Sequence, residues 1–293
     1  RETSDHPGAT QRPMISPTES EYQLFRELAR QDLGLDWTRD RKYLLETRLG
    51  PRLERLGLKS FSDYHQHLCG NGAFDGKQIF FNAITTTKTS FYRDQDDFAF
   101  FRKEVLPQIH TEAGNGDSPP VRFWSAGCSS GEEPLTLIFE TLEDLEHRTG
   151  YRKPFDLRIL GSDVNTDMLS IGENALYLDH QMIGLPPVVR EKYFRLTTGT
   201  GRSAHQVVKD VRSRVQYRHF NLLDRRYPIA TRFQVIFFRN VLYYLDRTLR
   251  KPLLDRLSEY LHPGGWLFLG NVETGYNISG LQKVRSNIFS KLP

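Results

Sequence analysis

The segment Val121–Pro134, VRFWSAGCSSGEEP, constrains the fold of this chain more than any other stretch. Its apolar start predicts a short strand, Val121–Trp124, which leads into a loop of small residues. Two carboxylates and a proline then begin a predicted helix that runs from Glu132 to about Leu145. A strand, a small-residue loop and a helix in this order are typical of an α/β domain that holds a nucleotide-like ligand at the carboxyl end of its first strand.

The charge at the start of this helix indicates which kind of ligand the loop holds. A phosphate is bound by bare backbone N–H groups, by a lysine or by the positive end of a helix, whereas Glu132 and Glu133 place negative charge there. The loop Ala126–Gly131 also lacks the GxGxxG pattern of pyrophosphate cofactors. The sequence therefore favours a neutral or cationic ligand, and S-adenosylmethionine fits better than a dinucleotide because its sulfonium and ammonium groups are cationic.

The alternation of strand and helix continues along the chain. The run Phe233–Phe238, FQVIFF, is apolar at nearly every position, as expected of a strand buried on both faces. Repeated units of this kind predict an α/β domain whose parallel sheet is covered by helices on both sides. Residues 191–212 break the pattern and predict an inserted antiparallel hairpin. The other predicted elements are strands at 157–161, 215–220 and 266–269 and helices at 98–110, 166–176 and 247–261.

The N-terminal part of the chain has a different pattern. Residues 1–17 lack periodicity and are interpreted as a disordered tail rather than a signal peptide. Residues 18–84 contain amphipathic segments that predict a small all-helical domain, with Ser16 as the first cap and Glu19 as its partner. The domain boundaries predicted from the sequence are thus 1–17, 18–84 and 85–293.

One predicted helix of this domain, Arg39 to Leu56, carries a stripe of arginines. At ~100° per residue they fall within a sector of about 60°, and the stripe is either a solvated face or a strip that docks an acidic partner helix. Gly50-Pro51 is expected to kink or split this helix, because proline removes a helix hydrogen bond. The stripe consists of Arg41, Arg48, Arg52 and Arg55.

The bulk properties exclude several classes of protein. The net charge of +4 permits acidic partners without demanding nucleic acid. Two cysteines, Cys69 and Cys128, are too few for a disulfide framework and indicate a reducing, cytoplasmic compartment. No apolar run approaches the ~20 residues of a membrane span. Motifs such as HExxH, a CxxC pair or GxxxxGK[ST] are also absent from the sequence, and Cys128 is interpreted as a small packed residue.

Polar residues follow the ends of the predicted strands. In a parallel sheet these ends converge on one crevice. An acidic residue after the second strand, here Asp163, is the usual partner of ribose hydroxyls, although a single such residue can equally be a structural cap. The hydroxyl-rich run Ile84–Asp94 is either a linker with a helix cap or a part of the site. The other residues at strand ends are Glu132, Asn221, Arg239 and Asn240.

Taken together, these segments resemble the CheR-type chemoreceptor glutamate methyltransferases. The resemblance extends from about Thr18 to the C-terminus and rests on segments in the family's order. It implies a class I, Rossmann-like methyltransferase domain with a seven-stranded sheet of order 3-2-1-4-5-7-6 whose last strand is antiparallel. It also implies a helical N-terminal domain and a small β-subdomain, formed by the hairpin and a neighbouring strand. The segments are TTTKTSFYRD, FWSAGCSSGEEP, ILGSDVNTDML, HFNLLD, VIFFRNVLYYLD and LHPGGWLFLGNVE.

The resemblance further implies S-adenosylmethionine as the cofactor, with no metal. Glu132 is expected to face the amino-acid end of the cofactor, Asp163 the ribose, and Asn221 and Leu222 the adenine. Arg93 and Tyr244 are expected nearest the transferred methyl group. The full set of cofactor-binding residues is Thr87, Thr89, Arg93, Ala126, Gly127, Glu132, Asp163, Asn221, Leu222, Arg239 and Asn240. Two departures from the family stand out, Thr87 in place of a frequent asparagine and Gly50-Pro51 in the helix whose basic face docks on the receptor.

The expected activity is methyl transfer to glutamate carboxylates on the cytoplasmic methylation helices of chemoreceptors, by a monomer. An ionised carboxylate needs no strong general base, so the enzyme has to position it in line and remove water from it. A receptor C-terminal tail at the β-subdomain is a second expected contact. Two other functions stay open, a cofactor-binding interaction module with little turnover and a nucleic-acid methyltransferase. Arg239-Asn240-Val241-Leu242 stands where the latter class has a [DNS]PP[YF]-type tetrapeptide.

Overall fold

The computed structural model describes residues 15–37, 41–70, 73–113, 120–149, 156–197 and 203–292. The chain divides into two compact units, one of Arg1–Asp32 with Trp37–Ile84 and one of Leu33–Asp36 with Thr85–Pro293. The predicted tail over residues 1–17 lies, except for its last three residues, outside the described residues.

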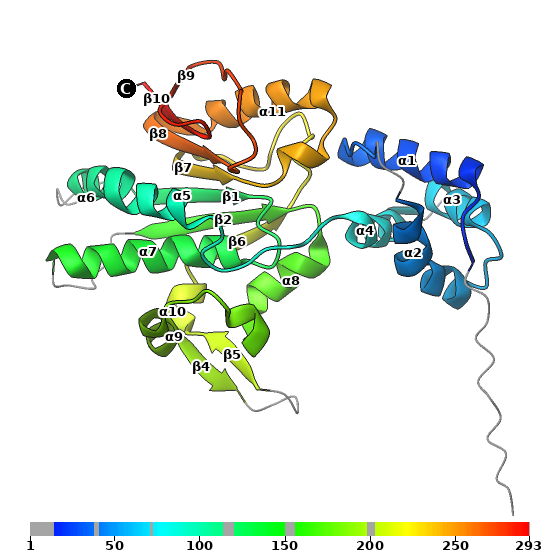
Figure 1. Cartoon of the computed structure of the whole chain (residues 1–293), viewed down its shortest axis with the longest axis horizontal. Helices are drawn as coiled ribbons and strands as arrows, with labels where there is room; N and C mark the ends of the chain where they lie inside the picture. The colour runs from blue at the N-terminus through cyan, green and yellow to red at the C-terminus, as the bar shows by residue number, and fades with distance from the viewer. Residues whose placement is uncertain are drawn as a thin grey trace, which may run out of the picture. The chain divides into compact units, whose positions relative to one another are not determined.

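The first unit is helical in its described residues, as predicted (Figure 1). Phe25 lies at the centre of its core, with ring centroids 5.8 Å from Phe61 and 5.5 Å from Phe80. These three rings join the first, third and fourth helices, and the fourth was not singled out in the sequence. The helices are α1 (Glu19–Leu33), α2 (Lys42–Leu56), α3 (Phe61–Cys69) and α4 (Ala73–Ile84).

The predicted cap of α1 at Ser16 is wrong, because Thr18 takes that role. The Thr18 hydroxyl accepts the N–H of Glu21 at 3.3 Å, and the Glu21 carboxylate accepts the N–H of Thr18 at 2.9 Å. Glu21 also accepts the N–H of Ser62 at 2.7 Å, which fastens α1 to the start of α3. The capping box two residues further on is therefore preferred because its carboxylate satisfies donors of two helices.

Gly50-Pro51 was predicted to kink or split α2, and the split is wrong, since the helix runs unbroken from Lys42 to Leu56. Pro51 is exposed, while Leu49 and Leu53 are buried on the core-facing side. The helix thus loses one hydrogen bond at Pro51, and burial of its leucines outweighs that loss.

Replacing Pro51 with alanine is expected to stabilise the helical unit by about 1–2 kcal/mol. Restoring the missing N–H and removing the ring gains up to about 3 kcal/mol, and the greater freedom of the unfolded chain takes back roughly 0.4–1 kcal/mol. Urea unfolding followed by circular dichroism measures the change. Lys59→Ala, at an exposed position after the helix, is the control and should have no effect. A lower midpoint for Pro51→Ala would show that the proline stabilises α2.

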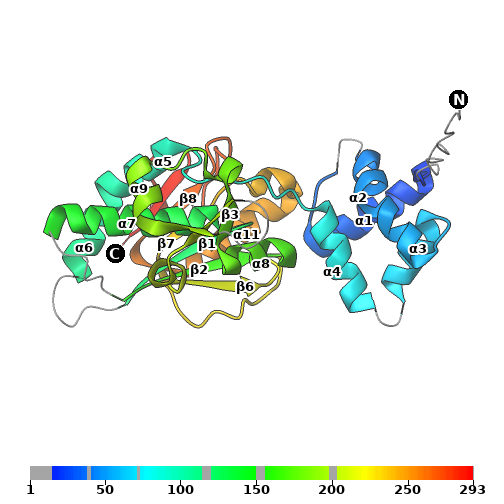
Figure 2. The ribbon, with the colours of Figure 1, turned by 90° about the horizontal axis from the view of Figure 1, so that it is seen from below.

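The second unit is built on a seven-stranded sheet of order β6-β2-β1-β7-β8-β10-β9. Adjacent strands from β6 to β8 pair in parallel, and β10 pairs antiparallel with β8 and β9. Numbered along the chain within this sheet, the order is 3-2-1-4-5-7-6, so the predicted topology is confirmed (Figures 1 and 2). The strands are β1 (Val121–Ala126), β2 (Leu157–Asp163), β6 (Val215–His219), β7 (Phe233–Phe238), β8 (Leu261–Leu269), β9 (Leu281–Lys283) and β10 (Ile288–Lys291).

Helices cover both faces of this sheet, because neighbouring strand residues belong to two different cores. Phe123 and Phe237 pack with α7 (Glu132–Thr149) and with the helical stretch before β1. Trp124 and Phe238 pack on the other face with α11 (Arg247–Glu259). The stretch before β1 consists of α5 (Gln95–Phe100), a π-helical turn (Phe101–Val105) and α6 (Leu106–Ala113).

The predicted β-subdomain is present as a three-stranded antiparallel sheet of order β3-β5-β4. Residues 198–202, the predicted turn of its hairpin, lie outside the described residues. In the part of the chain that the structure describes, no helix has the length and apolar character needed to cross a bilayer. The remaining elements are β3 (Leu176–Leu178), β4 (Phe194–Thr197), β5 (Ala204–Val207), α8 (Thr166–Asn174), α9 (Pro187–Tyr193), α10 (Lys209–Arg212) and two 3₁₀ turns (Asp179–Met182 and Leu242–Tyr244).

Candidate active site

The loop after β1 is held against the end of β2 by its backbone. The N–H groups of Gly127 and Cys128 both donate to the carbonyl of Ser162, at 2.8 and 3.0 Å. Gly127 has φ +78°, and a Cβ there would approach Val241 Cγ2 to 2.6 Å. The loop therefore needs glycine at this position, both for its conformation and for its close approach to the residues after β7. Cys128 is buried, which confirms its interpretation as a small packed residue.

Asp163, the last residue of β2, bonds with both of its carboxylate oxygens. Oδ2 accepts the N–H of Ser129 at 2.9 Å, and Oδ1 accepts the N–H of Asn165 at 2.8 Å. Burial raises the pKa of Asp163, and these backbone hydrogen bonds oppose the rise. The residue thus caps the adjacent loops, as the structural alternative predicted. A carboxylate offers about four acceptor sites, so it also has capacity left for ligand hydroxyls.

The two glutamates at the start of α7 have different surroundings. Glu133 accepts the Ser125 hydroxyl at 2.7 Å and lies 3.4 Å from Nη1 of Arg239. Glu132 is 3% exposed, and its Oε2 accepts the Ser130 hydroxyl at 2.7 Å. Burial raises the pKa of Glu132, opposed by its bond to Ser130. Glu133 is therefore compensated by a cation within the chain, whereas Glu132 has a neutral partner and a carboxylate that a cationic ligand would stabilise.

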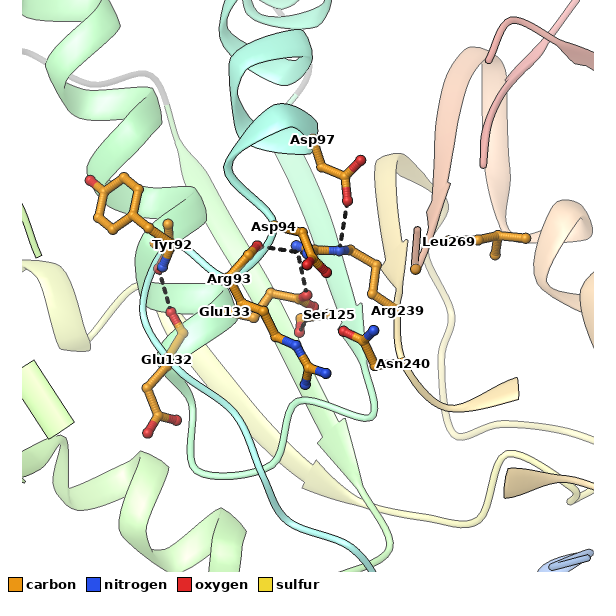
Figure 3. Close-up of polar contacts among 12 residues, drawn as sticks. Tyr92, Arg93, Asp94, Asp97, Ser125, Glu132, Glu133, Arg239, Asn240 and Leu269 are labelled. Carbon is orange, nitrogen blue, oxygen red and sulfur yellow. Dashed lines mark hydrogen bonds and ion pairs between the residues drawn. The ribbon is translucent and has the colours of Figure 1, made fainter. Parts of the chain in front are cut away.

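Arg239, directly after β7, joins three parts of the second unit. Its side chain is 1% exposed and lies 2.8 Å from Asp94, 3.1 Å from Asp97 and 3.4 Å from Glu133. Nη2 also donates to the carbonyl oxygen of Arg93 at 2.6 Å. Figure 3 shows the guanidinium pointing into this group of carboxylates. Arg239 therefore fixes the backbone that carries Arg93, and three carboxylates enclose its own charge.

Arg93 and Tyr244, the residues predicted nearest the methyl group, share a neighbour in Tyr243. The Tyr243 hydroxyl donates to the Tyr244 hydroxyl at 3.1 Å, and the two ring centroids are 4.2 Å apart. Burial and this hydrogen bond raise the pKa of Tyr243 to about 12, against the opposing charge of Arg93. Arg93 Nη1 donates to the carbonyl of Lys88 at 2.9 Å. The structure therefore brings one guanidinium and two phenols together.

The backbone of Tyr244 is held by a segment from the other end of the chain. The N–H of Asp36 donates to the Tyr244 carbonyl at 2.7 Å, and the N–H of Asp246 donates to the Gly34 carbonyl at 2.8 Å. Leu35 and Leu245 form an antiparallel bridge between these bonds. The short segment Leu33–Asp36, which begins at the last residue of α1, thus belongs to the second unit.

The other predicted cofactor residues are distributed around the same sheet edge. The Thr87 carbonyl accepts the Ser129 hydroxyl at 2.9 Å, so the hydroxyl-rich run contacts the loop after β1. Asn221 accepts the N–H of Leu223 at 2.9 Å in the turn after β6. Of the remaining four residues, Thr89 is half-buried, Ala126 ends β1, Leu222 packs beside the core under α11, and Asn240 has φ +62°.

Sequence reasoning missed Glu273, which links two strand ends. Its Oε2 accepts the N–H of Asn240 at 3.0 Å and the N–H of Gly270 at 2.8 Å. Glu273 is buried and follows β8, so the rule that selected Asp163 would also have selected it. Asp94, Asp97 and Tyr243 were missed as well, and the position of Tyr243 beside Tyr244 was the available signal.

The arginines of the predicted stripe are partly engaged within the first unit. Arg41 precedes α2 as its cap residue, and its N–H donates to the Tyr22 hydroxyl at 3.1 Å. Arg48 Nη1 donates to the Ala83 carbonyl at 2.8 Å, in the last turn of α4. Arg52 is half-buried and its charge acts on the Tyr64 hydroxyl of α3. Arg55 is exposed. The arginine stripe is thus neither a wholly solvated face nor wholly available for docking a partner helix.

The sheet order, and the acidic start of α7 that follows the small-residue loop after β1, define a class I methyltransferase. Residues 20–85 match the family described as "CheR methyltransferase, all-alpha domain", and residues 87–289 match "CheR methyltransferase, SAM binding domain". The chain therefore belongs to the CheR methyltransferase family.

Three curated relatives show how far the similarity extends. The chemotaxis protein methyltransferase of Borreliella burgdorferi is 28% identical over 94% of this chain and 96% of its own length. Chemotaxis protein methyltransferase 2 of Pseudomonas aeruginosa is 30% identical over 93% of each chain. Chemotaxis protein methyltransferase 1 of the same organism is 32% identical over 90% of this chain and 93% of its own.

The protein is thus an S-adenosylmethionine-dependent methyltransferase. The loop fits this cofactor, because the buried Glu132 carboxylate favours a cationic ligand and Gly127 keeps the backbone free of a Cβ. Among the described residues, no three histidines, cysteines, aspartates or glutamates are grouped so as to hold a metal ion.

Proposed function

We propose that this enzyme methylates glutamate side chains on the cytoplasmic methylation helices of chemoreceptors and forms γ-methyl esters. The observation that carries the proposal is the group of Arg93, Tyr243 and Tyr244. A guanidinium and phenolic hydroxyls are donors suited to an anionic oxygen acceptor. The relatives are named chemotaxis protein methyltransferases, which supports a protein substrate that takes part in chemotaxis.

In this proposal the cofactor lies along the loop after β1. Glu132 binds its ammonium end, Asp163 its ribose hydroxyls, and Asn221 and Leu222 flank the adenine. Ala126 and Gly127 approach it with backbone, and Thr87 and Thr89 cover it from the hydroxyl-rich run. Arg239 acts as a positioning residue behind the cofactor site, because its guanidinium is enclosed by carboxylates. Asn240 completes the pocket.

Methyl transfer to an ionised carboxylate requires little proton transfer by the protein. When bound, S-adenosylmethionine supplies a methyl group on a sulfonium, and the C–S bonding pair stays with sulfur as S-adenosylhomocysteine leaves. An oxygen lone pair of the ionised glutamate forms the new C–O bond, so no base is consumed. Arg93 and Tyr244 orient the carboxylate in line and exclude water from it. Orientation of this kind supplies the main rate gain.

We further propose that residues 18–84 form the receptor-docking domain and residues 85–293 the methyltransferase domain, with the β-subdomain at about 191–212. The exposed arginines Arg48 and Arg55 are the strongest candidates of the stripe for receptor contact. The β-subdomain is a second candidate contact, for a receptor tail. A cytoplasmic monomer is the form in which we expect the enzyme to act.

The test uses radiolabelled S-adenosylmethionine and a receptor cytoplasmic fragment. Label that is released as methanol by mild base identifies a carboxyl methyl ester. A receptor fragment with its methylation glutamates changed to alanine is the matched control and should stay unlabelled. Base-resistant label would contradict the proposal, as would equal labelling of both fragments. The interaction-module alternative predicts cofactor binding with little label in either.

Binding of S-adenosylmethionine is expected to weaken as the pH falls from 7 toward 5. Burial raises the pKa of Glu132 in the free protein, and a cationic ligand favours the charged carboxylate, so binding lowers that pKa again. Between the two pKa values binding must therefore release a proton. Calorimetry at pH 5.5 in buffers of different ionisation enthalpy measures this release.

Glu132→Gln is the matched variant for this experiment. It is expected to bind the cofactor roughly 10- to 100-fold more weakly at pH 7, the range for a lost hydrogen bond to a charged group. It should also release fewer protons than the parent. If parent and variant release the same number of protons, Glu132 does not contact the cationic end of the cofactor.

A further inference from the structure

Tyr243 and Tyr244 are consecutive residues whose side chains converge. They end the 3₁₀ turn Leu242–Tyr244, in which three residues make one turn and neighbouring side chains normally diverge. Here the ring centroids lie 4.2 Å apart and the hydroxyl oxygens 3.1 Å apart. Convergence of this kind requires a specially held backbone.

The backbone is held both before the turn and at its last residue. Asn240 has φ +62°, in the left-handed region, and its N–H is bonded to the buried carboxylate of Glu273 at 3.0 Å. The Tyr244 carbonyl accepts the N–H of Asp36 at 2.7 Å. Strained backbone that the surroundings keep in place is commonly found at functional sites. The pairing of the two rings is thus a fixed feature of this sheet edge.

The direction of the hydroxyl hydrogen bond determines what Tyr244 can do. Tyr243 is the donor and the Tyr244 oxygen is the acceptor. A phenol has one proton to donate, so the proton of Tyr244 remains available for another partner. Tyr243 is 39% exposed and its phenol also interacts with Arg93. A carboxylate that approaches Arg93 would therefore meet the free proton of Tyr244.

We propose that Tyr243 is a positioning residue for methyl transfer, which by donating to the Tyr244 hydroxyl directs the Tyr244 proton toward the acceptor carboxylate. This inference rests on the proposed function, because it assumes a carboxylate acceptor beside Arg93 and Tyr244. Without the Tyr243 hydroxyl, the Tyr244 hydroxyl is free to rotate and the carboxylate is held less well.

A double-mutant cycle of Tyr243→Phe and Tyr244→Phe tests the proposal. Tyr243→Phe is expected to lower kcat/KM for a receptor fragment about 3- to 10-fold, the range for one neutral hydrogen bond. In the Tyr244→Phe background the same change should have no further effect, because its partner is gone. The Kd for S-adenosylmethionine should stay unchanged in all variants, and Tyr276→Phe, a half-buried tyrosine elsewhere, should match the parent. Effects that multiply, or a fully active Tyr243→Phe, would overturn the proposal.

A second measurement does not depend on turnover. In protein labelled with ¹³Cζ-tyrosine, Tyr243→Phe is expected to shift the Tyr244 resonance, because the Tyr244 oxygen loses its donor, while Tyr276→Phe leaves that resonance unchanged. An unshifted Tyr244 resonance would overturn the inference even if receptor methylation is intact. Conversely, a shifted resonance in a protein that labels no receptor glutamate would refute the proposed function and leave the tyrosine pairing demonstrated.

Discussion

Replacing Arg239 with methionine should destabilise the second unit by about 3–5 kcal/mol, the cost of removing one partner from a buried ion pair. The variant keeps the carboxylates of Asp94, Asp97 and Glu133, all within 3.4 Å of the parent guanidinium. Burial already raises the pKa of Asp97 and Glu133, and Arg239 is the largest opposing influence on both. Without the guanidinium, these groups are either charged and uncompensated or protonated at a cost.

Calorimetric melting measures this effect, and its pH dependence tests the cause. At about 2–4 °C for each kcal/mol in a unit of this size, Tm should fall by roughly 6–20 °C at pH 7. In the variant the pKa values of Asp97 and Glu133 rise further above their unfolded values, so protonation relieves the penalty. The difference in Tm between parent and variant should therefore shrink as the pH falls from 7 to 5.

A matched control separates burial from charge. Arg158 pairs with Asp156 at the surface, with both side chains more than half exposed, and Arg158→Met should cost at most about 1 kcal/mol. A loss for Arg239→Met that is as small as this would show that the cluster around Arg239 contributes little. A difference in Tm between the parent and Arg239→Met that grows at acidic pH would contradict the assignment of the effect to these carboxylates.

The sequence predicted some features of the architecture and not others. The apolar run FQVIFF and the alternation of strand and helix sufficed for a parallel sheet covered on both faces. They carried no information on strand order, which came from the family resemblance alone. The proline rule misjudged the continuity of α2, because it ignores the buried leucines on the opposite face, which keep the helix continuous.

The rule that ligands meet polar residues at strand ends selected Glu132, Asp163 and Arg239, which lie at or after the ends of the adjacent strands β1, β2 and β7. It could not tell which of them would bind each other. Arg239 pairs with Asp97, and Asn240 with Glu273, across distances in sequence that no local pattern encodes. A side chain that follows a strand can contact a ligand or hold another loop, and only the folded geometry separates the two roles.

Arg93→Ala is expected to lower kcat for receptor methylation about 100-fold or more while the Kd for S-adenosylmethionine changes little. In the transition state the carboxylate loses part of its negative charge to the new C–O bond, so a purely coulombic partner would favour the ground state. Removing such a partner would raise KM and leave kcat intact or higher. A fall in kcat therefore reports orientation, for which a displacement of 1 Å can cost 100-fold.

The surroundings of Arg93 favour orientation over charge. Its carbonyl accepts from Arg239 at 2.6 Å, and its Nη1 donates to the Lys88 carbonyl at 2.9 Å, so the side chain is fixed at both ends. Lysine keeps the charge but not the planar fork, and Arg93→Lys should consequently be almost as slow as Arg93→Ala.

Tyr244→Phe should lower kcat more modestly, and Lys103→Ala, which alters a largely exposed side chain, should match the parent. Recovery of kcat in Arg93→Lys would assign Arg93 a coulombic role. If Arg93→Ala and Tyr244→Phe both keep the parent's kcat and bind normally, these residues do not belong to the site of methyl transfer.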